Sequence, residues 1–137
     1  MANLRIIFIP AKKISHLFPF KDRVPTVMQS LVVYKFRCAS CNAQYVGKTA
    51  RHLTTRVAEH QGISPRTQQP LQSPAFSAIR EHSHRSGHSI NQQDFSIVCK
   101  AKIKFDLSIM ETLEIQRTMP SLNTMQSSLP LELFTTV

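Results

Sequence analysis

Two cysteines and two histidines are spaced in pairs that suit a metal ion. Cys38 and Cys41 form a Cys-x₂-Cys pair, and His82 and His88 form a His-x₅-His pair further along the chain. Thiolates and imidazoles are the ligands of tetrahedral Zn²⁺. The distance between the pairs exceeds that of an ordinary zinc finger, so we expect a structural zinc site that joins two parts of one domain. His84 is left out because it lies off the helical face of His82. The alternative is two free thiols and surface histidines.

A second group of side chains combines two phenols with cationic and imidazole groups. Tyr34 and Tyr45 fall in two short stretches rich in β-forming residues, so that strand pairing brings them close. The next segment repeats His52, Arg56 and His60 at i, i+4, on one face of a helix. The alternatives are ordinary sheet packing for the tyrosines and an exposed helix end for His60.

One acidic residue falls in the apolar pattern of a later helix. Leu107, Glu111 and Ile115 follow one another at i, i+4 and i+8, so Glu111 lies on or near the buried stripe. A buried carboxylate needs a cation or a proton. We therefore expect either a salt bridge to Arg56 or a divalent-metal site, because Mg²⁺ accepts one or two protein carboxylates and keeps its waters.

The elements that must position these groups follow the order strand, strand, helix, helix, strand, helix. The expected strands are 31–37, 44–48 and 95–100. The first expected helix is capped by Thr49. The second has Ser73 as N-cap and Pro74 at its first position, and it ends near Ser86. The third is capped by Asp106 and runs from Leu107 to about Thr118. The Cys-x₂-Cys segment makes only a short connection between the first two strands, which are therefore expected to be antiparallel. The predicted fold is α+β, a small three-stranded antiparallel sheet flanked by helices.

Length and composition allow one domain of ordinary size. The chain has 137 residues, of which 42% are hydrophobic and 18% charged. We expect a folded domain at 31–123, an extended and partly disordered N-terminal arm at 1–30 and a C-terminal tail at 124–137. No apolar run reaches eighteen residues, so no membrane span or membrane partner is expected. The apolar residues 4–9 are interrupted by Arg5 and are too short for a secretory segment, so we expect an intracellular or nuclear protein. The odd number of cysteines, three, favours reduced thiols or a metal site.

The charge of the chain favours an anionic partner. The formal net charge is +9 and the pI is about 10.0, with the excess in the N-terminal half. Ribosomal, membrane-surface and nuclease proteins share such a charge, so that the charge alone does not choose between them.

The tyrosine pattern carries a family resemblance. Tyr34, followed eleven positions later by the run 45–49, Tyr-Val-Gly-Lys-Thr, and then by Arg56, resembles the signature of GIY-YIG nucleases. One position departs from it, because the first motif here is Val-Val-Tyr and lacks the glycine. That family also has an α+β fold with a metal-binding glutamate on the last helix, which matches Glu111, and an asparagine later in the chain, which matches Asn123.

The cysteines narrow the resemblance. A GIY-YIG signature with Cys38 and Cys41 between its tyrosines is similar to the endonuclease domain of Penelope-like retroelements. Residues 18–25, Phe-Pro-Phe-Lys-Asp-Arg-Val-Pro, resemble the segment that connects reverse transcriptase to the nuclease in those polyproteins. The resemblance therefore implies DNA as substrate and a reverse transcriptase domain of the parent element as a possible partner.

The implied activity is metal-dependent cutting of DNA, by nicking. The expected catalytic residues are Tyr34, Tyr45, Lys48, Arg56, His60, Glu111 and Asn123. Glu111 would hold Mg²⁺ or Mn²⁺, Tyr45 would act as base near Lys48, Arg56 would clamp the phosphate, and Tyr34 and His60 would orient water or shuttle a proton. The expected DNA contacts are Lys35, Arg37, Lys48, Arg51 and Arg56.

A non-enzymatic function is the alternative. A basic module stapled by zinc can bind nucleic acid without cutting it, and copies of retroelements persist as decayed fragments. Glu111 separates the two, because a pure binding module gains nothing from a carboxylate that repels phosphate. A ribosomal-type structural protein would show scattered basic and aromatic residues without this motif.

Overall fold

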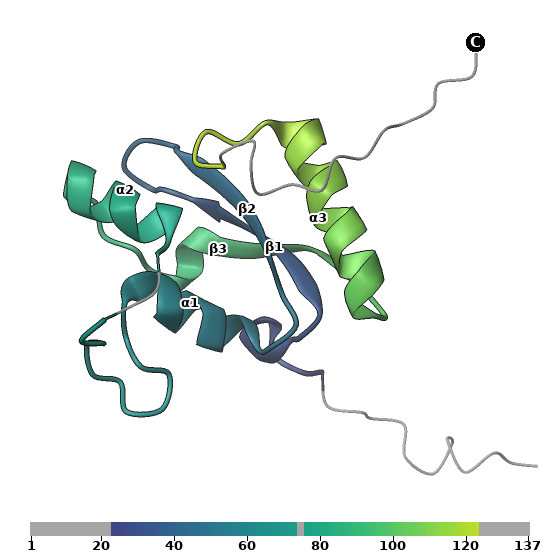
Figure 1. The fold of residues 1–137 in the computed structure, drawn as a ribbon, viewed down its shortest axis with the longest axis horizontal. Coiled ribbons are helices and arrows are strands. Elements are labelled where there is room, and N and C mark those ends of the chain that lie inside the picture. Colours follow the sequence, from purple (N-terminus) through teal and green to yellow (C-terminus); the bar gives the residue numbers. More distant parts are fainter. Residues whose placement is uncertain (1–22, 74–75, 124–137) are drawn as a thin grey trace, which may run out of the picture.

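Strand β1 (Val32–Arg37) is the centre of the molecule. The computed structural model describes residues 23–73 and 76–123, and its sheet has the order β2-β1-β3, with β2 at Gln44–Thr49 and β3 at Phe95–Lys100 (Figure 1). Both neighbours run antiparallel to β1. The predicted α+β fold with a three-stranded antiparallel sheet is confirmed, and each strand lies within one residue of its predicted bounds.

The alternating side chains of β1 face two different helical layers. Tyr34 and its neighbours on that face pack against α1 (Leu53–Gln61) and α2 (Ala78–Ser86), in a cluster that includes Val32, Phe36, Leu53, Val57, Ile79 and Phe95. Val33 lies on the opposite face, where α3 (Lys104–Thr118) covers it together with Val46 of β2. Because hydrophobic groups point both ways, β1 is buried almost throughout.

Two of the predicted helix starts were wrong by several residues. Thr49 does not cap α1; it is the last residue of β2, and its hydroxyl bonds the backbone of Arg51. The N-cap is His52, whose side chain instead bonds the carbonyl of Met28. Similarly, α3 begins at Lys104 after Ile103, so that Asp106 lies inside the first turn. Acidic groups in a first turn still favour the helix through its dipole.

The predicted start of α2 was also wrong. Its N-cap is Ser77 rather than Ser73, and the Ser77 hydroxyl accepts from the backbone N–H of Arg80. Pro74 lies outside the described residues. The predicted end is confirmed, because Gly87 has a left-handed φ of 70° that only glycine adopts without strain.

The chain after α3 returns to the free edge of β2. Ser121 accepts from the backbone N–H of Gln44, and the N–H of Leu122 donates to the carbonyl of Gln44. Asn123 bonds both backbone groups of Val46, accepting from N–H at 2.8 Å and donating to C=O at 2.7 Å. A side-chain amide thus takes the place of a strand residue beside β2.

The predicted arm is described only from residue 23 onward. Thr26–Met28 form a short 3₁₀ helix, η2, and the carbonyl of Gln29 accepts from the N–H of Leu53 at the start of α1. Residues 1–22 of the arm and the predicted tail at 124–137 lie outside the described residues. Among the helices of the described residues, none has the length and apolar character needed to cross a membrane.

Candidate functional site

A chain of hydrogen bonds runs from the surface into the core. Arg56 Nε donates to the Tyr34 hydroxyl oxygen at 3.2 Å, and that hydroxyl lies 2.7 Å from His60 Nε2. His60 Nδ1 lies 2.5 Å from the hydroxyl oxygen of Ser77. Tyr34 and His60 are 0% and 1% exposed, so the middle of this chain is shielded from water. The alternative of an exposed helix end for His60 is therefore wrong.

The donors and acceptors in this chain follow from Arg56. A guanidinium N–H only donates, so the Tyr34 oxygen accepts from Arg56 and its own proton points to His60 Nε2. Because Nε2 accepts, the single N–H proton of the neutral imidazole is assigned to Nδ1, which donates to the Ser77 hydroxyl oxygen. Burial raises the pKa of Tyr34 above its usual value, although the charge of Arg56 opposes this. Burial, and then Arg56, lower the pKa of His60 to about 3. At neutral pH, a protonated phenol therefore faces a neutral imidazole.

Tyr45 completes an aromatic cluster around this chain. Its ring centroid lies 6.4 Å from that of Tyr34 and 5.8 Å from that of His60. Burial raises the pKa of Tyr45; the charge of Arg56 opposes this and that of Glu111 adds to it. The charge of Glu111 also acts to raise the pKa of Tyr34. The strand pairing that was predicted to bring the tyrosines together is confirmed.

Gly47 lies beneath the two phenol rings. A Cβ atom added there would come within 2.7 Å of both the Tyr34 hydroxyl oxygen and Tyr45 Cε1. Carbon atoms do not approach that closely without displacement, so a side chain at this position would move at least one ring. Glycine is thus required here for space, since its backbone is that of an ordinary strand residue.

Replacement of Gly47 by alanine is expected to destabilise the fold by roughly 1–3 kcal/mol through overpacking. The measurement is urea unfolding of the two proteins. As a control, the same change in a Tyr45→Ala background should cost less, because one of the two clashing rings is gone. Equal losses in both backgrounds would mean that the rings do not cause the destabilisation.

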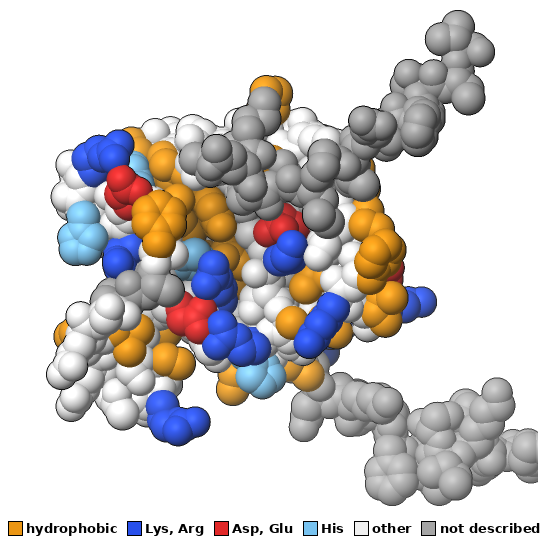
Figure 2. Space-filling view, in the orientation of Figure 1, with side chains coloured by type: hydrophobic (Ala, Val, Ile, Leu, Met, Phe, Trp, Pro, Cys, Tyr) orange, Lys and Arg blue, Asp and Glu red, His pale blue; other side chains and the backbone are white. Residues whose placement is uncertain are grey.

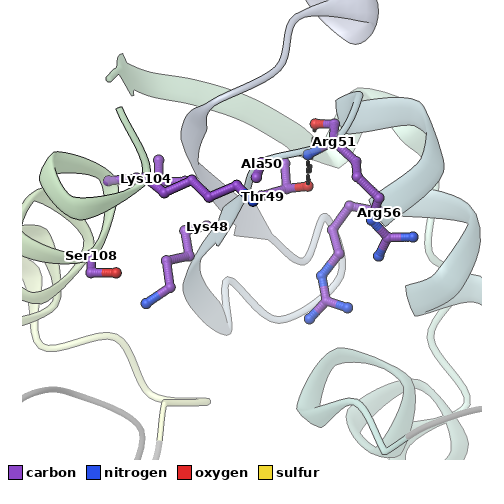
Figure 3. Close-up of a pocket in the computed structure, with 8 residues that line it drawn as sticks. Lys48, Thr49, Ala50, Arg51, Arg56, Lys104 and Ser108 are labelled. Carbon is purple, nitrogen blue, oxygen red and sulfur yellow. Dashed lines mark hydrogen bonds between the residues drawn. The ribbon is translucent and has the colours of Figure 1, made fainter. Parts of the chain in front are cut away.

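Four cationic side chains surround an open cavity of about 400 Å³. It is lined by Lys48, Thr49, Ala50, Arg51, Arg56, Lys104, Leu107 and Ser108. Figure 3 shows Lys48 and Arg56 extending in the same direction from β2 and α1, with their charged ends on either side of the opening. Figure 2 shows Lys and Arg side chains gathered around the middle of this face, with acidic side chains among them. The cavity suits an anion such as a phosphate.

Ion pairs hold the cations at the rim of this cavity. Glu59 bridges two arginines, with Oε1 at 2.6 Å from Arg51 and Oε2 at 3.0 Å from Arg56. Lys48 Nζ lies 2.7 Å from Glu111 Oε2, and Glu111 is only 8% exposed. The salt bridge considered for Glu111 therefore forms with Lys48 and not with Arg56. No group of three or more ligating side chains within the described residues includes Glu111.

The predicted DNA contacts divide into two sets. Lys48, Arg51 and Arg56 meet at the cavity, whereas Lys35 and Arg37 do not line it. Arg37 lies at the exposed hairpin turn, where its Nε donates to Asn42. Lys35 and Arg37 thus stay predictions for contacts away from the cavity.

The predicted cysteines and histidines converge at the other end of the sheet. Cys38 Sγ lies 3.4 Å from His88 Nδ1, and Cys41 Sγ lies 3.4 Å from His82 Nε2. All four ligand atoms lie within 4.8 Å of one another, so that the cluster could hold a metal ion. In a tetrahedral zinc site, neighbouring ligand atoms are roughly 3.3–3.8 Å apart. The distances are therefore compatible with structural zinc.

Local structure prepares this cluster for a metal. Cys38 is 1% exposed and belongs to the hydrophobic cluster on the Tyr34 face. Burial acts to raise its pKa, but the backbone groups of Ser40 and Cys41 outweigh this and the pKa is lowered. A thiolate is the form that binds metals. α2 contributes His82, and the left-handed turn at Gly87, which ends the helix, returns His88 toward it.

Two residues of the site escaped the sequence analysis. Ser77 ends the hydrogen-bond chain, and Glu59 aligns Arg51 with Arg56. Ser77 joins His60 across two helices, and no local pattern indicates such a pair. For Glu59 a signal was present, because it follows Arg56 by three residues on the same helix.

Comparison with known proteins adds no assignment, since no protein-family model, curated protein or solved structure matches this chain.

Proposed function

We propose that this chain is a metal-dependent DNA endonuclease of the GIY-YIG type that nicks one strand. One observation carries the proposal: Arg56, at the outer end of the hydrogen-bond chain through Tyr34 to His60, lines the same cationic cavity as Lys48, whose ammonium pairs with Glu111. Phosphodiester hydrolysis needs a base for water, a cation on the phosphate and a metal ligand. These groups come from different elements, α1, β1 and α3, and meet at one place.

The base in this proposal is Tyr34 acting through His60. The Tyr34 oxygen is covered by Arg56, so a bound phosphate would first have to draw Arg56 away from it; attacking water would then pass a proton to this oxygen while the Tyr34 proton moves to His60 Nε2. Ser77 keeps Nδ1 as a donor, so that Nε2 stays free to accept. A phosphate bound at Arg56 offsets one of the two causes that lower the pKa of His60. Tyr45 then orients water beside Glu111, which exchanges the roles first expected for the two phenols.

The cationic residues hold the phosphate. Arg56 presents a planar fork, fixed by Glu59, to two phosphate oxygens. Lys48 would turn from Glu111 to the phosphate when Glu111 takes a metal, which fits its 37% exposed side chain. Mg²⁺ or Mn²⁺ at Glu111 would supply a Lewis acid for the phosphoryl oxygen. Asn123 supports this arrangement from the edge of β2, since it fixes Val46 between Tyr45 and Gly47.

We assign the metal of the cysteine–histidine cluster as a structural Zn²⁺. Two thiolates and two imidazoles make a closed set of four ligands, which is typical of structural sites. The retroelement origin, a reverse transcriptase domain as partner and an intracellular or nuclear location stay predictions from the family resemblance.

Purified protein is expected to convert supercoiled plasmid to the open-circular form in Mg²⁺ buffer and not in the same buffer without Mg²⁺ or Mn²⁺. Arg56→Ala should slow nicking about a hundredfold or more, the scale of losing one preorganised donor. Arg56→Lys should restore little, because an ammonium cannot reproduce the fork. Arg66→Ala, which removes the same charge from an exposed loop, is the control. A plasmid left intact, or cut equally fast by Arg56→Ala, would contradict the proposal.

One observation favours the alternative, a zinc-stapled DNA-binding remnant without catalysis. Glu111 is already neutralised by Lys48 at 2.7 Å, so that the carboxylate also has a purely structural use. Such a protein would bind DNA through the cationic cavity and leave the plasmid intact with every divalent metal.

A further inference from the structure

A second cavity lies next to the cationic one and has a different character. Its volume is about 340 Å³, and it is lined by Arg51, Arg56, Glu59, Leu71, Phe76 and Ser77. Arg51 and Arg56 line both cavities, so the Arg51–Glu59–Arg56 bridge forms the wall between them. A phosphate held by Arg56 would therefore lie at the border of this second cavity.

Phe76 gives this second cavity an aromatic surface open to solvent. The side chain is 78% exposed, and Leu71 beside the same cavity is 37% exposed. Phe76 directly precedes Ser77, which is 8% exposed and bonded to His60. The backbone at Phe76 is thus tied to the core of the site, next to the Ser77 end of the hydrogen-bond chain.

We propose that this cavity is a nucleobase subsite, in which an unpaired base next to the bound phosphate stacks on Phe76. The ligand is inferred from charge and shape: a base joined to a phosphate places an anionic group at Arg56 and a flat apolar face at the ring. Stacking on aromatic side chains is how proteins hold single-stranded nucleic acid with little regard to sequence. The bases of an intact duplex are covered by their neighbours and offer only their edges.

The consequence concerns the class of substrate. The preferred DNA carries at least one unpaired nucleotide at the site, as a single strand, a flap or a base turned out of a duplex. Turning a base out of an intact duplex costs a few kcal/mol, whereas an unpaired base enters without that cost. This inference rests on the proposed function, because it takes the anion at Arg56 to be a DNA phosphate.

The test uses the absence of tryptophan from this chain. Phe76→Trp introduces one tryptophan at the ring position, and the measurement uses buffer without Mg²⁺ or Mn²⁺, so that DNA is bound and not cut while the zinc stays in place. A single-stranded oligonucleotide is expected to quench this fluorescence, because a stacked base contacts the indole. A blunt duplex of the same sequence, and an abasic strand with the same phosphates, should quench little. Phe105→Trp is the matched control, since Phe105 is 70% exposed on α3 and lines neither cavity.

Binding by Phe76→Ala gives the second measurement. Its dissociation constant for the single strand should rise about tenfold, within the range measured for losing one stacking partner. Affinity for the blunt duplex should change less than twofold, and Phe105→Ala should change neither. Equal quenching by the abasic strand, or equal effects of Phe76→Ala on single strand and duplex, would overturn the subsite. Failure to nick plasmid with the quenching intact would contradict the endonuclease proposal alone.

Discussion

Glu111→Ala is expected to abolish Mg²⁺-dependent nicking while affinity for DNA stays unchanged or increases. The carboxylate is the proposed metal ligand, and a metal supplies several kcal/mol of stabilisation to the transition state. The rate of nicking should therefore fall by roughly a thousandfold or more. Binding should not suffer, because the change removes a negative charge beside Lys48 and frees that ammonium for phosphate. Plasmid nicking in Mg²⁺ and oligonucleotide binding in buffer without Mg²⁺ or Mn²⁺, measured on the same preparation, give the two values.

Glu114→Ala is the matched control for this change. Glu114 lies one turn further along α3, is 9% exposed and pairs with Arg117, so that it resembles Glu111 in helix, burial and charge. The control should lose stability and keep nicking. Glu111→Gln keeps the side-chain volume and should still fail to cut. If Glu111→Ala nicks as fast as the parent protein, the metal is bound elsewhere or the activity is a contaminant.

Cys38→Ser is expected to remove the bound metal and much of the stability with it. The parent protein should contain about one zinc per chain, since structural zinc contributes on the order of 10 kcal/mol to the folding of small domains. Cys38 belongs to the hydrophobic cluster that includes Phe36 and Phe95, so the serine that replaces it also places a hydroxyl group among apolar side chains. Elemental analysis and thermal unfolding of both proteins measure the two effects.

Cys99→Ser provides the comparison for that experiment. Cys99 is the third cysteine, lies on β3 and packs partly buried on the opposite face of the sheet, outside the four-residue cluster. Its replacement should keep the zinc and cost far less stability. A parent protein that folds without zinc and is indifferent to chelators would show that the four side chains are not a metal site.

The features that could be predicted from the sequence are those that depend on local residue patterns. Alternation predicted β3 to the residue, and the spacing of Leu107, Glu111 and Ile115 predicted a buried carboxylate. The two ligand pairs were each visible as short motifs, and the structure brings them together. In these cases neighbours in the sequence supply the determining contacts.

What could not be predicted depends on contacts between distant elements. Thr49 has a good capping side chain, but pairing with β1 extends β2 through it and delays the helix to Leu53. Ser77 was missed because its partner His60 belongs to another helix. The salt-bridge alternative for Glu111 named Arg56 where the structure has Lys48, because helical spacing places a residue on a face and does not choose between the cations opposite it.

The amide of Asn123 ends the sheet with a side chain instead of another strand. An exposed strand edge is a template on which a second chain can add, and proteins guard such edges against aggregation. Asn123 meets the donor and the acceptor of Val46 at once, and Ser121 and Leu122 do the same for Gln44. A residue first considered for chemistry thus also occupies hydrogen-bonding groups of β2 to which another strand could otherwise pair.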